Sequence, residues 1–321
     1  MIGTKDFGRY IKTLNFFKFG RASLQFQNFY LLRFIQNNKI DIVHAHYGFI
    51  GNEAVFLKEI GLPIAFITTF HGVDIREGLK PENKGIYNKL FRHVDGIISI
   101  SNYNTRALKE MGAVDSKLVS LPNGIDTAYF SPSMEVNEEG IHILSVGRLM
   151  KVKGYDVAIS AFKMVCEQYH EQALTLHLVG DGPLQASLVE LTKQLQIEDR
   201  VVFHGWQPSK VIKELYQKAD LYLLSSRGEA LPTVLLEAQS CGLPVVATDV
   251  GSVRDMIPKE NCIVIPENTE ALANGILQML SQRENWEKIG SDNRNHVLTH
   301  YDEDVIMEKL LTLYKEYTNK P

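Results

Sequence analysis

Glu229 and Glu237 lie eight positions apart in the segment of the sequence that is best suited to chemistry. Pro232 suits the first position of a helix, because its missing N–H is not needed there. Glu229 is therefore expected in a loop and Glu237 more than one turn into the helix. On one continuous helix their carboxylates would be about 12 Å apart, which exceeds the roughly 5–9.5 Å of a glycosidase pair. We expect the carboxylates to bind two different groups, although two surface acids could share this spacing.

The start of the same helix is suited to phosphate binding. The first backbone N–H groups of a helix have no partner within it, and the helix dipole favours negative charge there. The N–H groups around Thr233 and Val234 would occupy this position. A phosphate-bearing ligand is therefore expected near the two glutamates.

Two positive charges come earlier in the chain. Arg148 and Lys153 follow a predicted strand, with Gly147 and Gly154 flanking them. An Arg and a Lys at this spacing are commonly surface charges. In a loop after a strand, with glycines on both sides, they could instead supply two positive charges to a ligand site.

Short apolar runs alternate with longer helical patterns from residue 40 onward. The runs are rich in Val, Ile and Leu and barely alternate with polar residues, which is typical of strands buried on both faces of a parallel sheet. Ten strands are predicted: Asp41–His46, Ile64–Phe70, Gly96–Ser101, Leu118–Leu121, His142–Gly147, Leu174–Gly180, Val201–Gly205, Leu221–Ser226, Pro244–Asp249 and Cys262–Ile265. Helices are predicted between them, for example Tyr155–Tyr169, Leu184–Leu195 and Thr233–Cys241, with a last helix over Glu303–Tyr317.

The stretch from Ser131 to Gly140 is the one clear linker. It predicts an α/β fold of two Rossmann-like, doubly wound parallel-sheet domains that face a cleft. The domains are expected at residues 1–135 and 140–298, and residues 299–321 form a C-terminal helix that could cross back to the first domain. Ligands are expected at the carboxyl ends of the strands.

Length and composition exclude several classes of protein. The 321 residues are too many for one ordinary domain, and 45% hydrophobic with 22% charged residues is typical of a globular protein. The longest apolar runs are about six residues, whereas roughly 20 are needed to span a bilayer, and no secretory signal is recognisable. Three widely spaced cysteines fit neither a disulfide framework nor a zinc site, so a cytoplasmic location is expected. They are Cys166, Cys241 and Cys262.

The segment from Ser225 to Pro244 resembles the GT4 family of retaining glycosyltransferases, which have the GT-B fold. Its frame is Ser-x-x-Glu-x-x-Pro-x-x-Leu-Leu-Glu-Ala, and it runs on into Cys-Gly-Leu-Pro-Val-Val-Ala-Thr. The resemblance extends over residues 40 to about 300. Other stretches that resemble the family, in the same order, are Asp41–Gly48, Thr69–Asp74, Leu121–Asp126, His142–Gly154, Leu178–Pro183 and Val201–Gly205.

The resemblance implies roles for individual residues. Arg148 and Lys153 would bind the diphosphate, while Glu229 would contact sugar hydroxyls and Glu237 the ribose. His71 would face the sugar from the opposite domain. The other donor-binding residues that it implies are Gly147, Trp206, Ala230, Leu231, Thr233 and Val234, and those on the acceptor side are His46, Gly48 and Asp74.

The predicted function is the transfer of a hexose-type sugar from a nucleotide-sugar donor to a glycan or lipid-linked acceptor, in bacterial polysaccharide or cell-surface glycan synthesis. No residue is an obvious covalent nucleophile, and the resemblance implies retention by front-side displacement with no cofactor and no metal. Two alternatives remain open. One is a nucleotide-sugar-binding relic or partner subunit without turnover, and the other is a nucleotide-sugar epimerase.

The sequence departs from the family pattern at its beginning. Family members normally start with a strand, a glycine-rich loop, a helix and a second strand, and here the first domain is expected to be incomplete. After Thr248-Asp-Val, the usual Gly-Gly is Gly251-Ser252, and the usual Glu is Asp255. These are mild changes near the expected donor phosphates.

Residues 1–40 are unusually basic and aromatic. They carry seven basic side chains, one acid and nine aromatic residues. Cationic and aromatic residues together suit an anionic membrane surface. An ordinary helix with a solvated basic face is the equally simple interpretation, and nucleic acid is a weaker one.

Three further patterns in the sequence are weaker indications of function. Gly180-Asp-Gly182 resembles a dinucleotide loop, but Gln185 stands where the third glycine is needed. The acidic Asp302-Glu-Asp304 suits the start of a helix, where it compensates the helix dipole. His44, His46 and His71 could approach one another as metal ligands, but no acidic or cysteine ligand completes the set.

Overall fold

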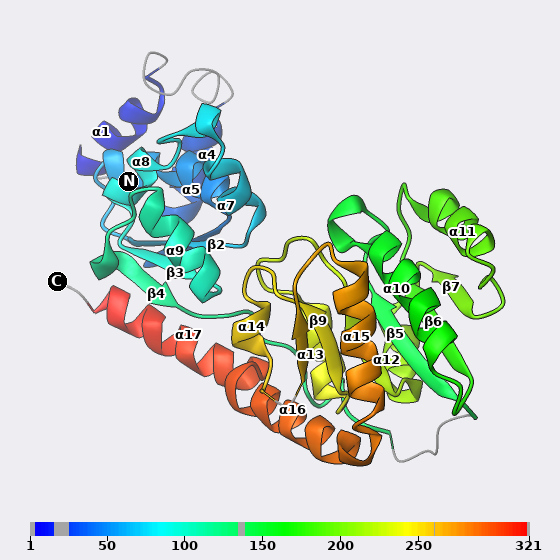
Figure 1. Ribbon diagram of the computed structural model, residues 1–321. Coiled ribbons are helices and arrows are strands. Elements are labelled where there is room, and N and C mark those ends of the chain that lie inside the picture. The colour runs from blue at the N-terminus through cyan, green and yellow to red at the C-terminus, as the bar shows by residue number, and fades with distance from the viewer. Residues whose placement is uncertain (1–3, 16–25, 134–138, 260, 320–321) are drawn as a thin grey trace. The chain divides into compact units, whose positions relative to one another are not determined.

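The computed structural model describes residues 4–15, 26–133, 139–259 and 261–319. The chain forms two compact units (Figure 1). The first consists of Met1–Leu121 and Glu308–Pro321, and the second of Pro122–Met307. The compact units therefore divide at Leu121, upstream of the linker stretch expected at residues 131–140, and residues 134–138 of that stretch lie outside the described part.

The first unit contains a four-stranded parallel sheet in the order β1-β2-β3-β4. Its strands are β1 (Ile42–His46), β2 (Ala65–Phe70), β3 (Gly96–Ser99) and β4 (Leu118–Ser120). The chain returns between them through helices, which is the connection that parallel strands require. The connecting helices are α5 (Gly48–Ala54), α6 (Phe56–Glu59), α7 (Val73–Gly78), α8 (Asn88–His93) and α9 (Asn102–Glu110). Two more helices precede β1: α1 (Thr4–Thr13) and α4 (Gln27–Asn37).

The second unit contains a six-stranded parallel sheet in the order β10-β9-β8-β5-β6-β7. Its strands are β5 (Ile141–Val146), β6 (Leu174–Val179), β7 (Val201–Gly205), β8 (Leu221–Leu224), β9 (Val245–Thr248) and β10 (Cys262–Val264). Its helices are α10 (Tyr155–Gln168), α11 (Gln185–Gln194), α12 (Ser209–Lys218), α13 (Thr233–Ser240), α14 (Val253–Met256), α15 (Thr269–Leu280) and α16 (Trp286–His300). The order turns back between β5 and β8, so the sheet is doubly wound.

Successive residues of a strand point to opposite faces, so each buried strand contributes to two cores. On β5, Ile143 belongs to a core with α10 and α15, whereas Leu144 belongs to a core with α12 and α13. Figure 1 shows α10 and α15 on one side of this sheet and α12 and α13 on the other. The second unit is thus a three-layer α/β sandwich, as its apolar strands predict.

The last helix, α17 (Glu303–Thr318), begins in the second unit and ends in the first. Residues from Glu308 onward belong to the compact unit that contains β1 to β4. All ten predicted strands are present, with ends that differ from the predictions by at most two residues. The prediction of two parallel-sheet α/β domains is confirmed.

Candidate functional site

Glu229 lies in the loop between β8 and α13. Its Oε1 atom accepts hydrogen bonds from Nζ of Lys153 and Oγ of Ser226, each at 2.6 Å. Lys153 comes from the short 3-10 turn Lys151–Lys153, which follows β5. The side chain of Lys153 is 22% exposed and that of Glu229 is 10% exposed. The two contacts engage the same carboxylate oxygen and fix the loop carboxylate next to a cation.

Two glycines allow other backbone segments to approach this loop closely. Gly251 has a φ of +57°, and a Cβ atom there would lie 1.6 Å from the carbonyl oxygen of Glu229. Gly154 has a φ of +66°, and a Cβ atom there would lie 2.1 Å from the carbonyl oxygen of Ser225. A larger residue would displace the loop and would also be strained at such angles. The position of Glu229 therefore depends on both glycines.

Glu237 lies in α13, one turn beyond Thr233 and Val234. The hydroxyl of Tyr216 donates to Oε2 of Glu237 over 3.0 Å. Burial raises the pKa of Glu237, and the hydrogen bond from Tyr216 offsets part of this rise. Pro232 precedes the helix as its N-cap rather than as its first residue, so Thr233 and Val234 supply the first N–H groups, which have no acceptor within the helix.

Two arginines, Arg227 in this loop and Arg148 in the segment after β5, differ in their exposure. The guanidinium of Arg227 binds both carboxylate oxygens of Asp156 at 2.9 and 2.7 Å, and it also donates to Glu267 over 2.7 Å. Hydrogen bonds from Arg227 lower the pKa of Asp156. Arg148, which follows β5 and Gly147, is exposed. Arg227 is therefore part of the framework, and Arg148 is the arginine open to a ligand.

In the first unit, the structure brings His46 and His71 together. Nδ1 of His46 lies 2.9 Å from Nε2 of His71, and the two rings stack with their centroids 5.1 Å apart. Burial, together with the neighbouring His46, lowers the pKa of His71. Tyr47 packs on His71 at 4.7 Å and has a φ of +74°, which is unusual for a residue with a side chain. The carboxyl ends of β1 and β2 therefore carry a constrained aromatic cluster.

Gly48 and Asp74 lie beneath this cluster. The carboxylate of Asp74 is fully buried and accepts hydrogen bonds from the backbone N–H of Gly48, His71 and Gly72 at 2.8 to 3.0 Å. A Cβ atom on Gly48 would lie 2.3 Å from the ring of Phe70. Both residues thus position the loops that carry His46 and His71, and their assignment to the acceptor side stays a prediction.

Comparison with known proteins identifies the family. Residues 129–296 match the family model for glycosyl transferases group 1, and residues 5–129 match the model for glycosyltransferase family 4. This chain belongs to the glycosyl transferases group 1 family. It is 32% identical to the putative colanic acid biosynthesis glycosyltransferase WcaL of Escherichia coli, over 86% of this chain and 70% of that protein. It is 31% identical to the amylovoran biosynthesis glycosyltransferase AmsK of Erwinia amylovora, over 85% and 70%.

Solved structures give the same fold. A glycosyltransferase from Rickettsia africae superposes with a TM-score of 0.79 at 22% identity, covering 90% of this chain and 80% of that one. HepE from Anabaena, in complex with UDP, superposes with a TM-score of 0.78 at 21% identity, covering 88% and 81%. This glycosyltransferase therefore has the GT-B architecture that its motifs predict.

The other residues predicted for the donor side occupy loops of the second unit. Trp206 follows β7 and is 70% exposed. Ala230 and Leu231 lie in the Glu229 loop, where Oγ of Ser252 donates to the carbonyl oxygen of Ala230 over 2.5 Å. Ser252 is the residue that departs from the family's usual Gly-Gly, and here it helps to hold the loop.

Sequence reasoning missed three residues of these clusters. Ser226 could have been found from its place three positions before Glu229 in the family frame. Tyr216 lies 21 positions before its partner Glu237, and no local spacing indicates that contact. The positive φ of Tyr47 also has no signal in the residue type, because such angles are normally left to glycine or asparagine.

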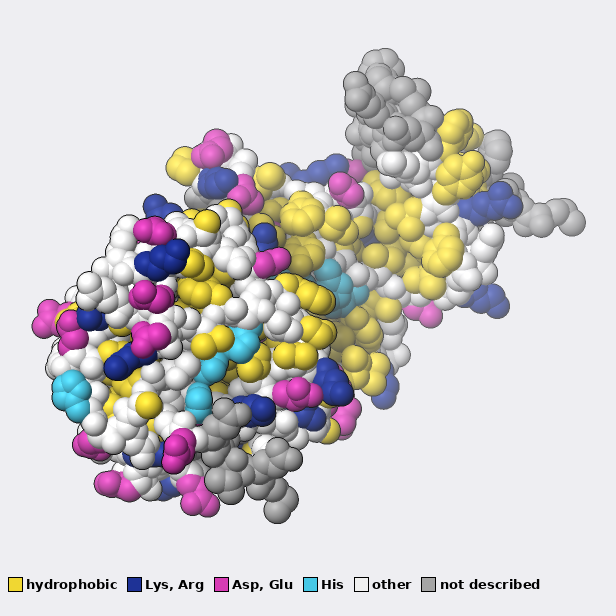
Figure 2. Space-filling model, turned by 90° about the vertical axis from the view of Figure 1, so that its right-hand side faces the viewer, with side chains coloured by type: hydrophobic (Ala, Val, Ile, Leu, Met, Phe, Trp, Pro, Cys, Tyr) yellow, Lys and Arg dark blue, Asp and Glu magenta, His cyan; other side chains and the backbone are white. Residues whose placement is uncertain are grey.

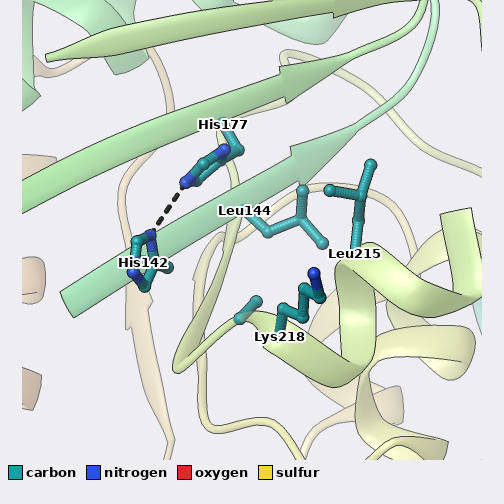
Figure 3. A pocket seen from close by; sticks show the side chains of 6 residues that line it. His142, Leu144, His177, Leu215 and Lys218 are labelled. Carbon is teal, nitrogen blue, oxygen red and sulfur yellow. Dashed lines mark hydrogen bonds between the residues drawn. The ribbon is translucent and has the colours of Figure 1, made fainter. Parts of the chain in front are cut away.

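A second histidine cluster lies outside these sites. His142, His177 and His204, on β5, β6 and β7, form a row in which neighbouring ring nitrogens are 3.0 Å apart. Figure 3 shows the first two beside a pocket of about 170 Å³, whose other walls include Leu144, Leu215 and Lys218. Across the part of the chain that the structure describes, no group of three or more His, Cys, Asp or Glu side chains is arranged to hold a metal ion.

Proposed function

We propose that this glycosyltransferase moves a hexose-type sugar from a nucleotide-sugar donor to a glycan or lipid-linked acceptor, with retention of configuration and without a metal. The observation that carries the proposal is the Lys153–Glu229 pair beside the start of α13. It combines a cation and free helix N–H groups, which suit a diphosphate, with a carboxylate that can accept hydrogen bonds from sugar hydroxyls.

The proposed donor site assigns each charged residue one task. Arg148 and Lys153 stabilise the negative charge that grows on the diphosphate as the glycosidic bond breaks, and they take the place of a metal ion. Glu229 orients the sugar through its hydroxyls. Glu237, which Tyr216 holds in α13, accepts hydrogen bonds from the ribose, and the exposed Trp206 contacts the base.

The proposed mechanism is front-side displacement, as the family resemblance implies. Glu229 is already engaged by Lys153 and Ser226, which supports a role in orientation rather than as a covalent nucleophile. The acceptor hydroxyl would then enter on the face that the diphosphate leaves. On the same resemblance, His71 and His46 are proposed for the sugar and acceptor side.

The names of relatives support the proposed setting. WcaL and AmsK are named for colanic acid and amylovoran biosynthesis, and both products are bacterial polysaccharides. HepE structures contain UDP or UDP-glucose, which makes a UDP-sugar the first donor to test. We propose that this chain works in the same kind of pathway, in the cytoplasm at the inner face of the membrane.

Contact with the membrane is proposed through α4 and α1. On α4 the exposed apolar side chains include Tyr30 at 64% and Phe34 at 59%, and Arg33 beside them is also exposed. The exposed Ile11 and Lys12 of α1 have the same mixed character. Figure 2 shows hydrophobic side chains crowded beside the grey atoms at the top of the view. Apolar groups with nearby cations suit an anionic bilayer surface.

None of the described helices is both long and apolar enough to cross a bilayer. The proposed contact is with the lipid headgroups, through α4 and α1. Other aromatic and basic residues of the predicted membrane segment lie outside the described residues: Phe16, Phe17, Lys18, Phe19 and Arg21.

A thermal-shift screen against UDP, GDP, ADP and their sugar conjugates tests the donor site. A ligand that binds only the folded state raises the melting temperature by mass action. We expect one nucleotide to give a clear shift that EDTA does not abolish. A shift that appears only with Mn²⁺ would contradict the metal-free mechanism. No shift with any nucleotide, for a protein that melts cooperatively, would contradict the donor assignment.

A further inference from the structure

Tyr314, in the C-terminal helix α17, contacts the histidine cluster of the first unit. Its hydroxyl lies 2.6 Å from Nδ1 of His44. On the other side of the same ring, Nε2 of His44 lies 2.6 Å from Oγ1 of Thr69 on β2. Both nitrogens of His44 therefore have a hydroxyl partner, and together the two contacts fix the orientation of the ring.

Packing along α17 holds Tyr314 in place. Leu313 and Tyr317 are each 8% exposed, so this face of the helix is buried within the first unit. The hydroxyl of Tyr317 occupies the space where Gly96 has no side chain, because a Cβ atom on Gly96 would lie 2.4 Å from it. The packing of α17 in the first unit thus holds Tyr314 in position next to His44.

His44 connects Tyr314 to the two histidines at the ends of β1 and β2. Its ring stacks on His46, with centroids 4.4 Å apart and an interplanar angle of 27°. His46 in turn shares the 2.9 Å contact between ring nitrogens with His71. His44 and His46 are two residues apart on one strand and so lie on the same face. The order of contacts is Tyr314, His44, His46 and His71.

The protons in this chain can be assigned from the acidities of the partners. A phenol, with an ordinary pKa of about 10, is a better donor than an aliphatic hydroxyl. Burial raises the pKa of Tyr314, which keeps its proton in place. Tyr314 therefore donates to Nδ1 of His44, and Nε2–H of His44 donates to Thr69. Protonation of Nδ1 would break the first of these hydrogen bonds.

The other groups around the cluster also favour the neutral form of the imidazoles, with the exception of Asp74. Burial and the neighbouring His46 and His71 lower the pKa of His44 to about 4. Burial and His46 also lower the pKa of His71, whereas Asp74 opposes this effect. At neutral pH, His44 and His71 are therefore neutral imidazoles.

We propose that Tyr314 and His44 are positioning residues that hold the rings of His46 and His71 in a fixed orientation for the transfer reaction. The inference rests on the function proposed for His71 and extends it to residues that touch no substrate. A neutral imidazole can donate one hydrogen bond and accept another, whereas an imidazolium can only donate. His46 already contacts Nε2 of His71, so one ring nitrogen remains for a sugar hydroxyl, and only in the neutral ring can that nitrogen accept a hydrogen bond.

The test compares Tyr314→Phe with Tyr317→Phe. Both variants remove one phenolic hydroxyl from α17, one turn apart, and the contact with His44 is made by Tyr314. NMR titration of the imidazole nitrogens should show wild-type His44 as the Nε2–H tautomer, neutral to near pH 4. In Tyr314→Phe the pKa of His44 should rise by about one pH unit, since one hydrogen bond to the neutral form is lost. Tyr317→Phe should keep the wild-type titration.

Activity gives the second measurement. Tyr314→Phe should lower kcat by about tenfold with little change in KM, and it should move the acid limb of the pH profile to higher pH. Equal effects from Tyr317→Phe, or an unchanged His44 titration in Tyr314→Phe, would overturn the positioning role. Loss of transfer in the wild type itself, with donor still bound, would instead count against the proposed function, and the NMR titration separates the two failures.

Discussion

Nζ of Lys153 lies 2.6 Å from Oε1 of Glu229, although the two residues are 76 positions apart in the chain. The contact joins the loop after β5 to the loop after β8, strands that are neighbours in the sheet. In a parallel sheet, such loops meet at the carboxyl edge. The ion pair therefore holds both charges at one site before a donor arrives. Under the proposed function, each residue has one role in the free protein and a second role towards the donor.

Removing either charge should abolish transfer, for different reasons. Lys153→Ala removes a cation from the departing diphosphate, and we expect kcat/KM to fall by about 100-fold or more, as for loss of a charged transition-state contact. Glu229→Ala should lower kcat to a similar degree, because the sugar loses its orientation. Initial rates with the donor identified by thermal shift would measure both effects.

Lys151→Ala is the matched control for the lysine. Lys151 belongs to the same 3-10 turn, is exposed, and lies two positions before Lys153. Its loss should change the rate by less than about twofold, as expected for a surface charge. Near-wild-type activity in both Lys153→Ala and Glu229→Ala would overturn the site assignment.

Glu237 should make nucleotide binding depend on pH. Its carboxylate must be ionised to accept hydrogen bonds from two ribose hydroxyls, and burial raises its pKa. Affinity should therefore fall as the pH drops, beginning above the pH at which an ordinary glutamate takes up a proton. Glu237→Gln should weaken nucleotide binding by about 10-fold or more and flatten the pH dependence. Calorimetric titration with UDP between pH 4.5 and 8 would measure both.

Tyr216→Phe tests how much the hydrogen bond from Tyr216 contributes to the behaviour of the Glu237 carboxylate. The hydroxyl of Tyr216 favours the ionised form of Glu237 through the hydrogen bond to Oε2. Without it, the pH at which affinity falls should move further upward, while affinity at pH 8 changes little. A pH dependence that survives intact in Glu237→Gln would show that another group controls binding.

The sequence predicts the fold well because the second sheet is buried on both faces. Runs such as Leu221–Leu224 and Val245–Thr248 are apolar throughout, and no surface helix would tolerate such runs. The loops proposed to bind the donor follow from the same logic, since Arg148 and Lys153 lie in the segment after β5 and Glu229 lies in the loop after β8. The first unit was harder to delimit, because its last element, the end of α17, is about 190 residues further along the chain.

Contacts between distant segments could not be predicted. Tyr216 and Glu237, or His44 and Tyr314, meet only because the fold brings two elements together. Their residue types are common, and their spacing follows no short period. Asp74 illustrates a related difficulty, because a motif position suggests substrate contact whereas full burial among backbone N–H groups indicates a supporting role.

The histidine row in the second unit should make stability depend on pH. Burial, with His204 and His142 nearby, lowers the pKa of His177 to about 4. The unfolded chain keeps an ordinary histidine pKa of about 6.5 and so binds more protons between these values. The contribution of His177 to the free energy of unfolding is therefore fully present above about pH 6.5 and is lost as the pH drops towards 4. Because the row is partly exposed, screening should limit the contribution to about 1–2 kcal/mol.

Urea unfolding at pH 7.5, 5.5 and 4.5 would measure this contribution. His177→Gln should lose less of its unfolding free energy than the wild type does over this range, because the variant has no imidazole to protonate. His170→Gln, which changes an exposed histidine in the loop after α10, should behave like the wild type. Identical pH dependence in wild type and His177→Gln would mean that the row does not titrate in this way.

The exposed face of α4 should bind anionic lipid. Tyr30→Ser with Phe34→Ser removes two large apolar groups that are 64% and 59% exposed, and Arg33→Gln removes the cation beside them. We expect the double variant to lose most of its binding to vesicles that contain phosphatidylglycerol, and the arginine variant to lose about 1 kcal/mol of binding free energy, with weaker dependence on salt.

Leu311→Ser is the matched control, since Leu311 is 50% exposed on α17. Vesicle flotation at 0.05 and 0.5 M salt would compare the variants, because screening weakens the electrostatic part at the higher concentration. If all of them float alike, or if neutral phosphatidylcholine vesicles bind as well as anionic ones, α4 is not the membrane contact.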